Sequence, residues 1–153
     1  MKKVACSVLA FLLVVSFALP CFAVEPEDVI VSQTIQQLGT DSYIIITLRK
    51  SVPTPIARSG IYTQTGSKDY TYVSSGTLQW TFSVAGNFEI NPGVSCKCTN
   101  SAYRFSRSVS GWSLSSADSS HSGSTATAWG TVTGPKPVSP RVSVSCDSNG
   151  NLT

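Results

Sequence analysis

The sequence predicts an all-β domain in which two antiparallel sheets pack face to face. The clearest observation is residues 78–84, where apolar and polar side chains alternate with the period of a half-buried strand. Extended segments recur about every ten residues with Gly and Pro between them, and no segment after residue 23 has a convincing helical pattern. We therefore expect an antiparallel, immunoglobulin-like β-sandwich.

The first 23 residues have the features of a secretory signal. Lys2 and Lys3 precede an apolar run over residues 4–19, and small residues stand at the −3 and −1 positions of a cut after Ala23. We expect a signal helix that is cleaved there, which leaves a secreted chain without stable membrane association. The alternative is a retained anchor, although a spanning helix needs ~20 apolar residues and this run contains Cys6, Ser7 and Ser16.

The chain after the signal has a length that suits one domain. Residues 24–40 are expected to form an N-terminal extension, in which residues 25–28 make an acidic turn and residues 29–38 suit a short helix or an edge strand. Residues 41–153 are expected to form the sandwich. Loss of Lys2 and Lys3 leaves nine Lys and Arg against eight Asp and Glu, and these cations are scattered. Nucleic-acid binding is therefore not expected.

The first strands follow from β-branched and aromatic residues. Residues 43–48 predict a central strand buried on both faces. Residues 51–59 contain two prolines and predict a loop, after which residues 61–63 are extended. Residues 66–69 predict a turn into a strand over residues 70–73.

The middle of the chain continues the alternation. Gly86-Asn87 follows residues 78–84 at a spacing typical of a hairpin, and Phe88 and Ile90 continue the apolar face. Asn91-Pro92-Gly93 predicts the next turn, before extended segments over residues 94–99 and 103–105.

The last third differs in composition. Ten of the nineteen residues in 106–124 are serine, which predicts a mobile surface excursion. Residues 125–133 predict a strand whose small residues face inward, opposite a bulky residue such as Trp80. Residues 134–140 predict a stiff, proline-rich connector, and residues 141–146 the final strand.

Several of these segments together resemble a known group of proteins. They are Trp80-Thr81-Phe82, the strand with two cysteines, the tryptophan in the serine-rich stretch and the closing Val-Ser-Cys-Asp-x-Asn-Gly of residues 144–150. This combination resembles small exported proteins of Gram-positive bacteria, a family of unknown function. The resemblance covers residues 70–152 and implies a β-fold but no activity.

Three cysteines remain after signal cleavage: Cys96, Cys98 and Cys146. Cys96 and Cys98 are too close in a strand for an unstrained bond, whereas Cys98 and Cys146 each share a face with apolar neighbours. We expect a disulfide between Cys98 and Cys146, and the alternative is three reduced, buried thiols. The spacing lacks the paired ligands of zinc motifs, so neither a metal nor a cofactor is expected.

A catalytic site is not expected. His121 is the single histidine of the chain, with Asp118 nearby in sequence and serines around it. A Ser-His-Asp triad drawn from them would lie in a serine-rich loop, whereas catalytic groups need rigid support. A solvated histidine is the simpler interpretation, and a hydrolase using His121 is the weakest functional alternative.

Aromatic side chains give the best candidate for a ligand site. Trp112, Trp129, Tyr70 and Tyr72 include several that are predicted to point outward, and sugars stack on exposed rings. The alternative is that these rings pack in the core, with Trp129, which shares a face with threonines, as the expected exception. The sequence thus predicts a secreted, non-catalytic binding or structural module with a glycan or protein partner. The alternative from another functional class is a secreted antimicrobial or toxin-like β-protein.

Overall fold

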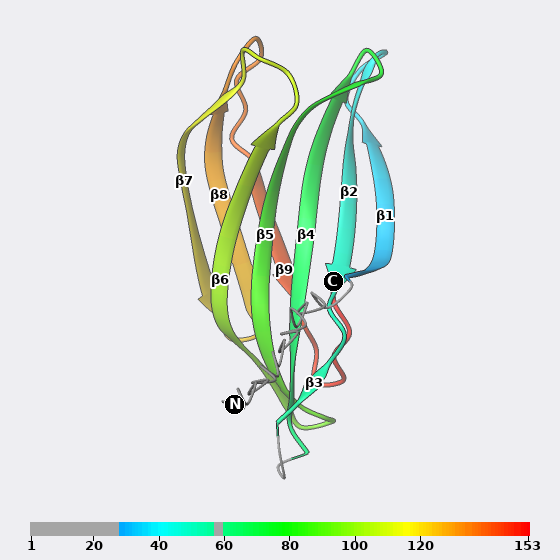
Figure 1. Cartoon of the computed structure of the whole chain (residues 1–153), viewed down its shortest axis with the longest axis vertical. Coiled ribbons are helices and arrows are strands. Elements are labelled where there is room, and N and C mark those ends of the chain that lie inside the picture. Colours follow the sequence, from blue (N-terminus) through cyan, green and yellow to red (C-terminus); the bar gives the residue numbers. More distant parts are fainter. Residues whose placement is uncertain (1–27, 57–59) are drawn as a thin grey trace, which may run out of the picture.

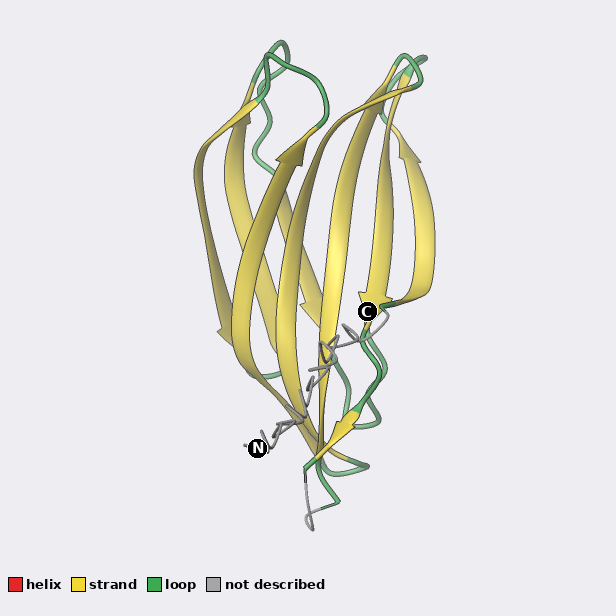
Figure 2. Cartoon of the chain, in the orientation of Figure 1, coloured by secondary structure: helices red, strands yellow, loops and turns green. Residues whose placement is uncertain are grey.

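The protein is all-β over the part of the chain that the structure describes. The structure is a computed structural model that describes residues 28–56 and 60–153, and no helix occurs among these residues (Figures 1 and 2). The expected signal over residues 1–23 lies outside the described residues. The strands are β1 (Val29–Gln37), β2 (Ser42–Lys50), β3 (Thr54–Pro55), β4 (Tyr62–Ser74), β5 (Thr77–Asn91), β6 (Ser95–Arg107), β7 (Ser113–Ser122), β8 (Thr125–Thr133) and β9 (Arg141–Ser145).

These strands form two antiparallel sheets. Sheet A has the order β1-β2-β4-β5-β6, with β3 paired to β4, and sheet B has the order β7-β8-β9. Sheet B lies against β4, β5 and β6, so that β1 and β2 extend beyond it (Figure 1). Apart from β3, neighbouring strands follow one another along the chain. An immunoglobulin domain instead has Greek-key connections, so the likeness to that fold is limited to its two layers.

The core lies between the two sheets and is built mainly on β5. The alternation that the sequence shows holds from Trp80 and continues to Ile90. Leu78, predicted on the same apolar face, is 39% exposed, because the register between β4 and β5 shifts at Tyr72 and Val73. The inward side chains of β5, in sheet A, are at most 2% exposed. They pack against the inward side chains of β8 and β9, in sheet B. These residues are Trp80, Phe82, Val84, Phe88 and Ile90 in β5, Ala126, Ala128 and Val132 in β8, and Val142 and Val144 in β9.

Small residues of β8 face the core, as predicted. Ala126, Ala128 and Gly130 are buried, and a Cβ at Gly130 would lie 3.1 Å from the ring of Phe82. The bulky residue that packs on the small side of β8 at this point is therefore Phe82 rather than Trp80. The connector over residues 134–140 and the final strand also lie where they were predicted.

Two expected turns are instead the middles of long strands. Gly66 lies within β4 and Gly86 within β5, and the two residues are paired across the sheet. A Cβ at Gly66 would lie 2.7 Å from Leu152 Cδ1, and a Cβ at Gly86 would lie 2.8 Å from Ala126 Cβ. These glycines therefore permit close packing between elements, which is a role that short-range turn patterns do not distinguish from a turn.

The serine-rich segment is a strand, and the predicted mobile excursion is wrong. Strand β7 pairs with β8 along its length, and Leu114 and Ala117 pack against the core. All of its serines are exposed or half-buried. Pairing with β8 holds this segment, because backbone hydrogen bonds do not require apolar side chains on the outer face.

In the N-terminal part of the domain one prediction holds and one does not. Residues 29–37 form the edge strand β1, which was one of the two predicted alternatives, and it pairs with β2 of the sandwich. Strand β2 lies second from the edge rather than at the centre, and Ile44, Ile45 and Ile46 are only half-buried. Sheet B does not reach over β2, which leaves both of its faces partly open.

Candidate functional site

The predicted aromatic platform is divided between the core and the surface. Trp112 is 4% exposed, and its Nε1 donates a hydrogen bond to Gln79 Oε1 at 3.1 Å. Its ring packs edge-on against Tyr72 at 5.8 Å between centroids, with Trp80 at 6.3 Å. This aromatic cluster borders a small apolar hollow of about 100 Å³ beneath the connector between β8 and β9. Trp112 is therefore part of the core, and Tyr72 is half-buried against it.

Trp129 lies apart from that cluster. It is 36% exposed on the outer face of sheet B, where the Arg141 guanidinium lies 5.7 Å from its ring centroid. Tyr70 is half-buried on the inward face of β4 and packs against the core. Tyr70 and Tyr72 share the inward face of β4 and Trp112 packs against Tyr72, whereas Trp129 lies on the outer face of sheet B. The four predicted residues therefore do not form one exposed surface for stacking a sugar.

The acid and the histidine of the Ser-His-Asp triad considered from the sequence do not contact each other. Asp118 and His121 are separated by three positions in β7, and side chains alternate between faces along a strand. Asp118 pairs across the sheet with Trp129, whereas His121 pairs with Ala126. The two side chains therefore lie on opposite faces, and Asp118 does not orient His121.

The predicted disulfide is not formed in the structure, where Cys96, Cys98 and Cys146 are free thiols. Cys98 and Cys146 are buried, and Cys96 is half-buried. Burial raises the pKa of all three thiols, which for Cys146 reaches about 12. Within the described residues, no group of three or more His, Cys, Asp or Glu side chains is arranged to hold a metal ion.

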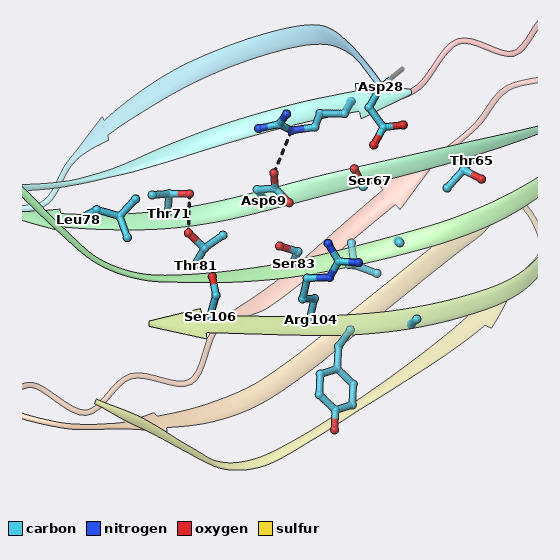
Figure 3. A pocket seen from close by; sticks show the side chains of 15 residues that line it. Asp28, Thr65, Ser67, Asp69, Thr71, Leu78, Thr81, Ser83, Arg104 and Ser106 are labelled. Atoms are coloured by element: carbon cyan, nitrogen blue, oxygen red, sulfur yellow. Dashed lines mark hydrogen bonds and ion pairs between the residues drawn. The ribbon is translucent and has the colours of Figure 1, made fainter. Parts of the chain in front are cut away.

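A polar hollow with a volume of about 620 Å³ lies on the outer face of sheet A (Figure 3). We call it the trough. Its floor is the polar side of the strands whose other side forms the core, and it crosses β2, β4, β5 and β6. Its polar side chains are Asp28, Arg49, Thr65, Ser67, Asp69, Thr71, Thr81, Ser83, Arg104 and Ser106.

Strand alternation builds this surface directly. Along β4 and β5 the side chains that face the core alternate with side chains on the outer face. The hydroxyl side chains of these two strands that line the trough are Thr65, Ser67, Thr71, Thr81 and Ser83. Thr71 and Thr81 are paired across these strands and share a hydrogen bond of 3.1 Å between their hydroxyl oxygens (Figure 3). A hydroxyl donates one hydrogen bond and accepts two, so such pairs retain capacity for a ligand.

The trough also contains charges of both signs. Arg49 Nε donates to Asp69 Oδ2 at 3.1 Å, and this ion pair joins β2 to β4. Arg104 projects from β6 on the same face, on the side of Ser83 (Figure 3). Among the described residues Arg104 forms no ion pair, whereas Arg49 is matched by Asp69. Arg104 is therefore the cation with free capacity to bind an anionic group.

Sequence reasoning did not find the trough. The alternation over residues 78–84 identified a polar face but not the strands that lie beside it. The signal in the sequence was the small hydroxyl residues at alternate positions 63, 65, 67 and 71, and again at 81 and 83, with two arginines on flanking strands. Only the pairing of β2, β4, β5 and β6 places them together.

The comparisons with known proteins identify no relative: no family model, curated protein or solved structure matches the chain. In the described part of the chain, no helix is both long enough and apolar enough to cross a membrane.

Proposed function

We propose that the protein is a secreted, non-catalytic binding module that uses the trough to hold a hydroxyl-rich ligand carrying acidic groups, such as an acidic glycan. The observation that carries the proposal is the free guanidinium of Arg104 among the serine and threonine hydroxyls of the trough. Arginine binds carboxylates in a bidentate manner, and hydroxyl side chains exchange hydrogen bonds with sugar hydroxyls.

The ligand class follows from what the trough offers. Its polar lining is dominated by short side chains, which suits recognition by hydrogen bonds rather than by stacking on an aromatic ring. Its volume of about 620 Å³ is within the range of sites for small ligands or for a few units of a polymer. The shallow, polar surface favours a modest affinity that decreases with added salt.

Binding of polygalacturonate, with neutral dextran as the comparison, tests this proposal. We expect the purified protein to bind polygalacturonate more tightly than dextran in isothermal calorimetry, and less tightly as the salt concentration rises. Substitution Arg104→Gln should weaken that binding about tenfold, because it removes a charged hydrogen-bond donor.

Two matched control variants distinguish binding in the trough from binding elsewhere on the surface. Lys97→Gln removes a cation from the same strand outside the trough, and Trp129→Ala removes the exposed ring on sheet B. Both should bind polygalacturonate as the unchanged protein does. The proposal fails if the protein does not bind polygalacturonate, or if Arg104→Gln leaves the affinity unchanged.

A further inference from the structure

The three thiols lie together at one end of the sandwich. Cys96 and Cys98 are on β6, opposite the core residues Ile90 and Phe88 of β5, and so lie on the inward side of sheet A. Cys146 directly follows β9 of sheet B. The cysteines therefore come from both sheets and converge on the space between them.

Backbone hydrogen bonds fix this arrangement. Cys98 N donates to Gly123 O at 2.8 Å, and Cys146 N donates to Ser124 O at 3.0 Å, so both cysteines are bonded to the turn between β7 and β8. Gly93 N also donates to Ser148 O at 3.0 Å, which ties the turn before β6 to the segment after β9.

The side chains select one pair among the three thiols. The Cys96 and Cys146 thiols face each other within hydrogen-bonding reach, and the Cys146 thiol also donates to the carbonyl oxygen of Asp147 at 3.4 Å. The Cys98 thiol instead donates to the carbonyl oxygen of Asn100 at 3.2 Å, on its own strand. Burial is the largest cause of the raised pKa of Cys146, and the Cys96 thiol is the next. Cys96 is therefore the direct neighbour of Cys146.

We propose that Cys96 and Cys146 form a disulfide that covalently joins sheet A to sheet B, and that Cys98 stays a buried free thiol. This inference goes beyond the proposed function, since it does not depend on the ligand of the trough. The pair differs from the Cys98–Cys146 bridge predicted from the sequence. That prediction assumed that the cysteines on the same face as apolar residues form the bridge.

The oxidant is a disulfide, either of an exported thiol–disulfide oxidoreductase or of oxidised glutathione. Cys96, the more exposed thiol of the pair, attacks it as the thiolate and forms a mixed disulfide, releasing one thiol of the oxidant. Cys146 then attacks the Cys96 sulfur and releases the second thiol. Two electrons pass to the oxidant, whose two sulfurs take up the two protons. Because burial disfavours the Cys146 thiolate, we expect this second step before or during closure of the sandwich.

Tryptic mapping distinguishes the possible pairs, because Lys97 lies between Cys96 and Cys98. The reduced, unfolded protein is refolded with reduced and oxidised glutathione, and then alkylated in denaturant without reductant. We expect one alkylated thiol, on the peptide of residues 98–104, and a disulfide between the peptides of residues 69–97 and 142–153. Three alkylated thiols, or a link from residues 98–104 to residues 142–153, would overturn the proposal.

Two serine variants test the same assignment by stability. The oxidised Cys98→Ser protein should melt roughly 10 °C above its reduced form, because a bridge over about 50 residues restricts the unfolded chain. Cys96→Ser should lose this difference between the oxidised and reduced forms. An undiminished difference in Cys96→Ser would assign the bridge to Cys98 and reject the proposal.

Discussion

At Gly86 the two sheets approach so closely that only a hydrogen atom fits where a side chain would stand. A Cβ there would lie 2.8 Å from Ala126 Cβ in sheet B and 2.9 Å from the Phe88 ring. Both neighbours are fully buried, so neither has free space to move into. This position shows how a single residue sets the separation of the two layers.

Substitution Gly86→Ala should therefore destabilise the fold through overpacking. We expect the free energy of unfolding to decrease by about 1–3 kcal/mol, measured by urea denaturation. Ser83→Ala is the matched control on the same strand, because its side chain points into the trough, and it should change the stability by less than about 0.5 kcal/mol. Equal stability of Gly86→Ala and the unchanged protein would show that the sheets are not packed as described.

Among the elements, the turn after β9 is organised by one carboxylate. Asp147 Oδ1 accepts hydrogen bonds from the backbone N–H of Asn149 at 2.8 Å and of Asn151 at 2.9 Å, and Oδ2 accepts from Asn151 Nδ2 at 2.8 Å. These bonds, led by the Asn151 side chain, hold the pKa of Asp147 below its ordinary value. The turn reverses the direction of the chain, so that Leu152 pairs with Cys146 and its side chain packs in the core.

This geometry gives a pH dependence with a defined sign. Because the pKa of Asp147 is lower in the folded protein than in the unfolded chain, the ionised carboxylate stabilises the fold fully above about pH 5. The stabilisation decreases as the pH falls through the folded pKa. We expect Asp147→Asn to lower the Tm at pH 7, with a smaller effect at pH 2.

The control for this prediction is Glu89→Gln, an exposed carboxylate on β5. Its Tm should follow that of the unchanged protein over the whole pH range. A constant difference in Tm between Asp147→Asn and the unchanged protein, from pH 7 to pH 2, would contradict the role of the carboxylate.

Elements with strong alternation were predictable from the sequence, and those that depend on pairing partners were not. Residues 78–84 and 125–133 have one apolar face each, and both are strands with that face inward except at Leu78, which is exposed. The serine-rich residues of β7 have little apolar periodicity, so only their register with β8 reveals the strand. Gly66 and Gly86 have the composition of turns, but the constraint on them comes from Leu152 and Ala126, which are distant in the chain.

At the scale of the whole molecule, the sequence predicted the polar residue types of the candidate site but not their position in the fold. Alternation predicted that the hydroxyl residues of β5 lie outside the core, but the trough also needs residues of β2, β4 and β6. The aromatic residues were identified by type alone, and tertiary packing separates Trp112 from Trp129. Which faces meet, and which stay open, is set by the order of strands in sheet A and by the limited width of sheet B.

The most direct measurement for the central claim is a map of ligand binding by NMR. Trigalacturonate, a short acidic oligosaccharide, would be titrated into isotope-labelled protein while the backbone amide signals are followed. Binding in the trough predicts shifts confined to the facing segments of β4, β5 and β6, around Asp69, Ser83 and Arg104. Shifts centred on Trp129 and Arg141 of sheet B, or no shifts at millimolar ligand, would contradict the account.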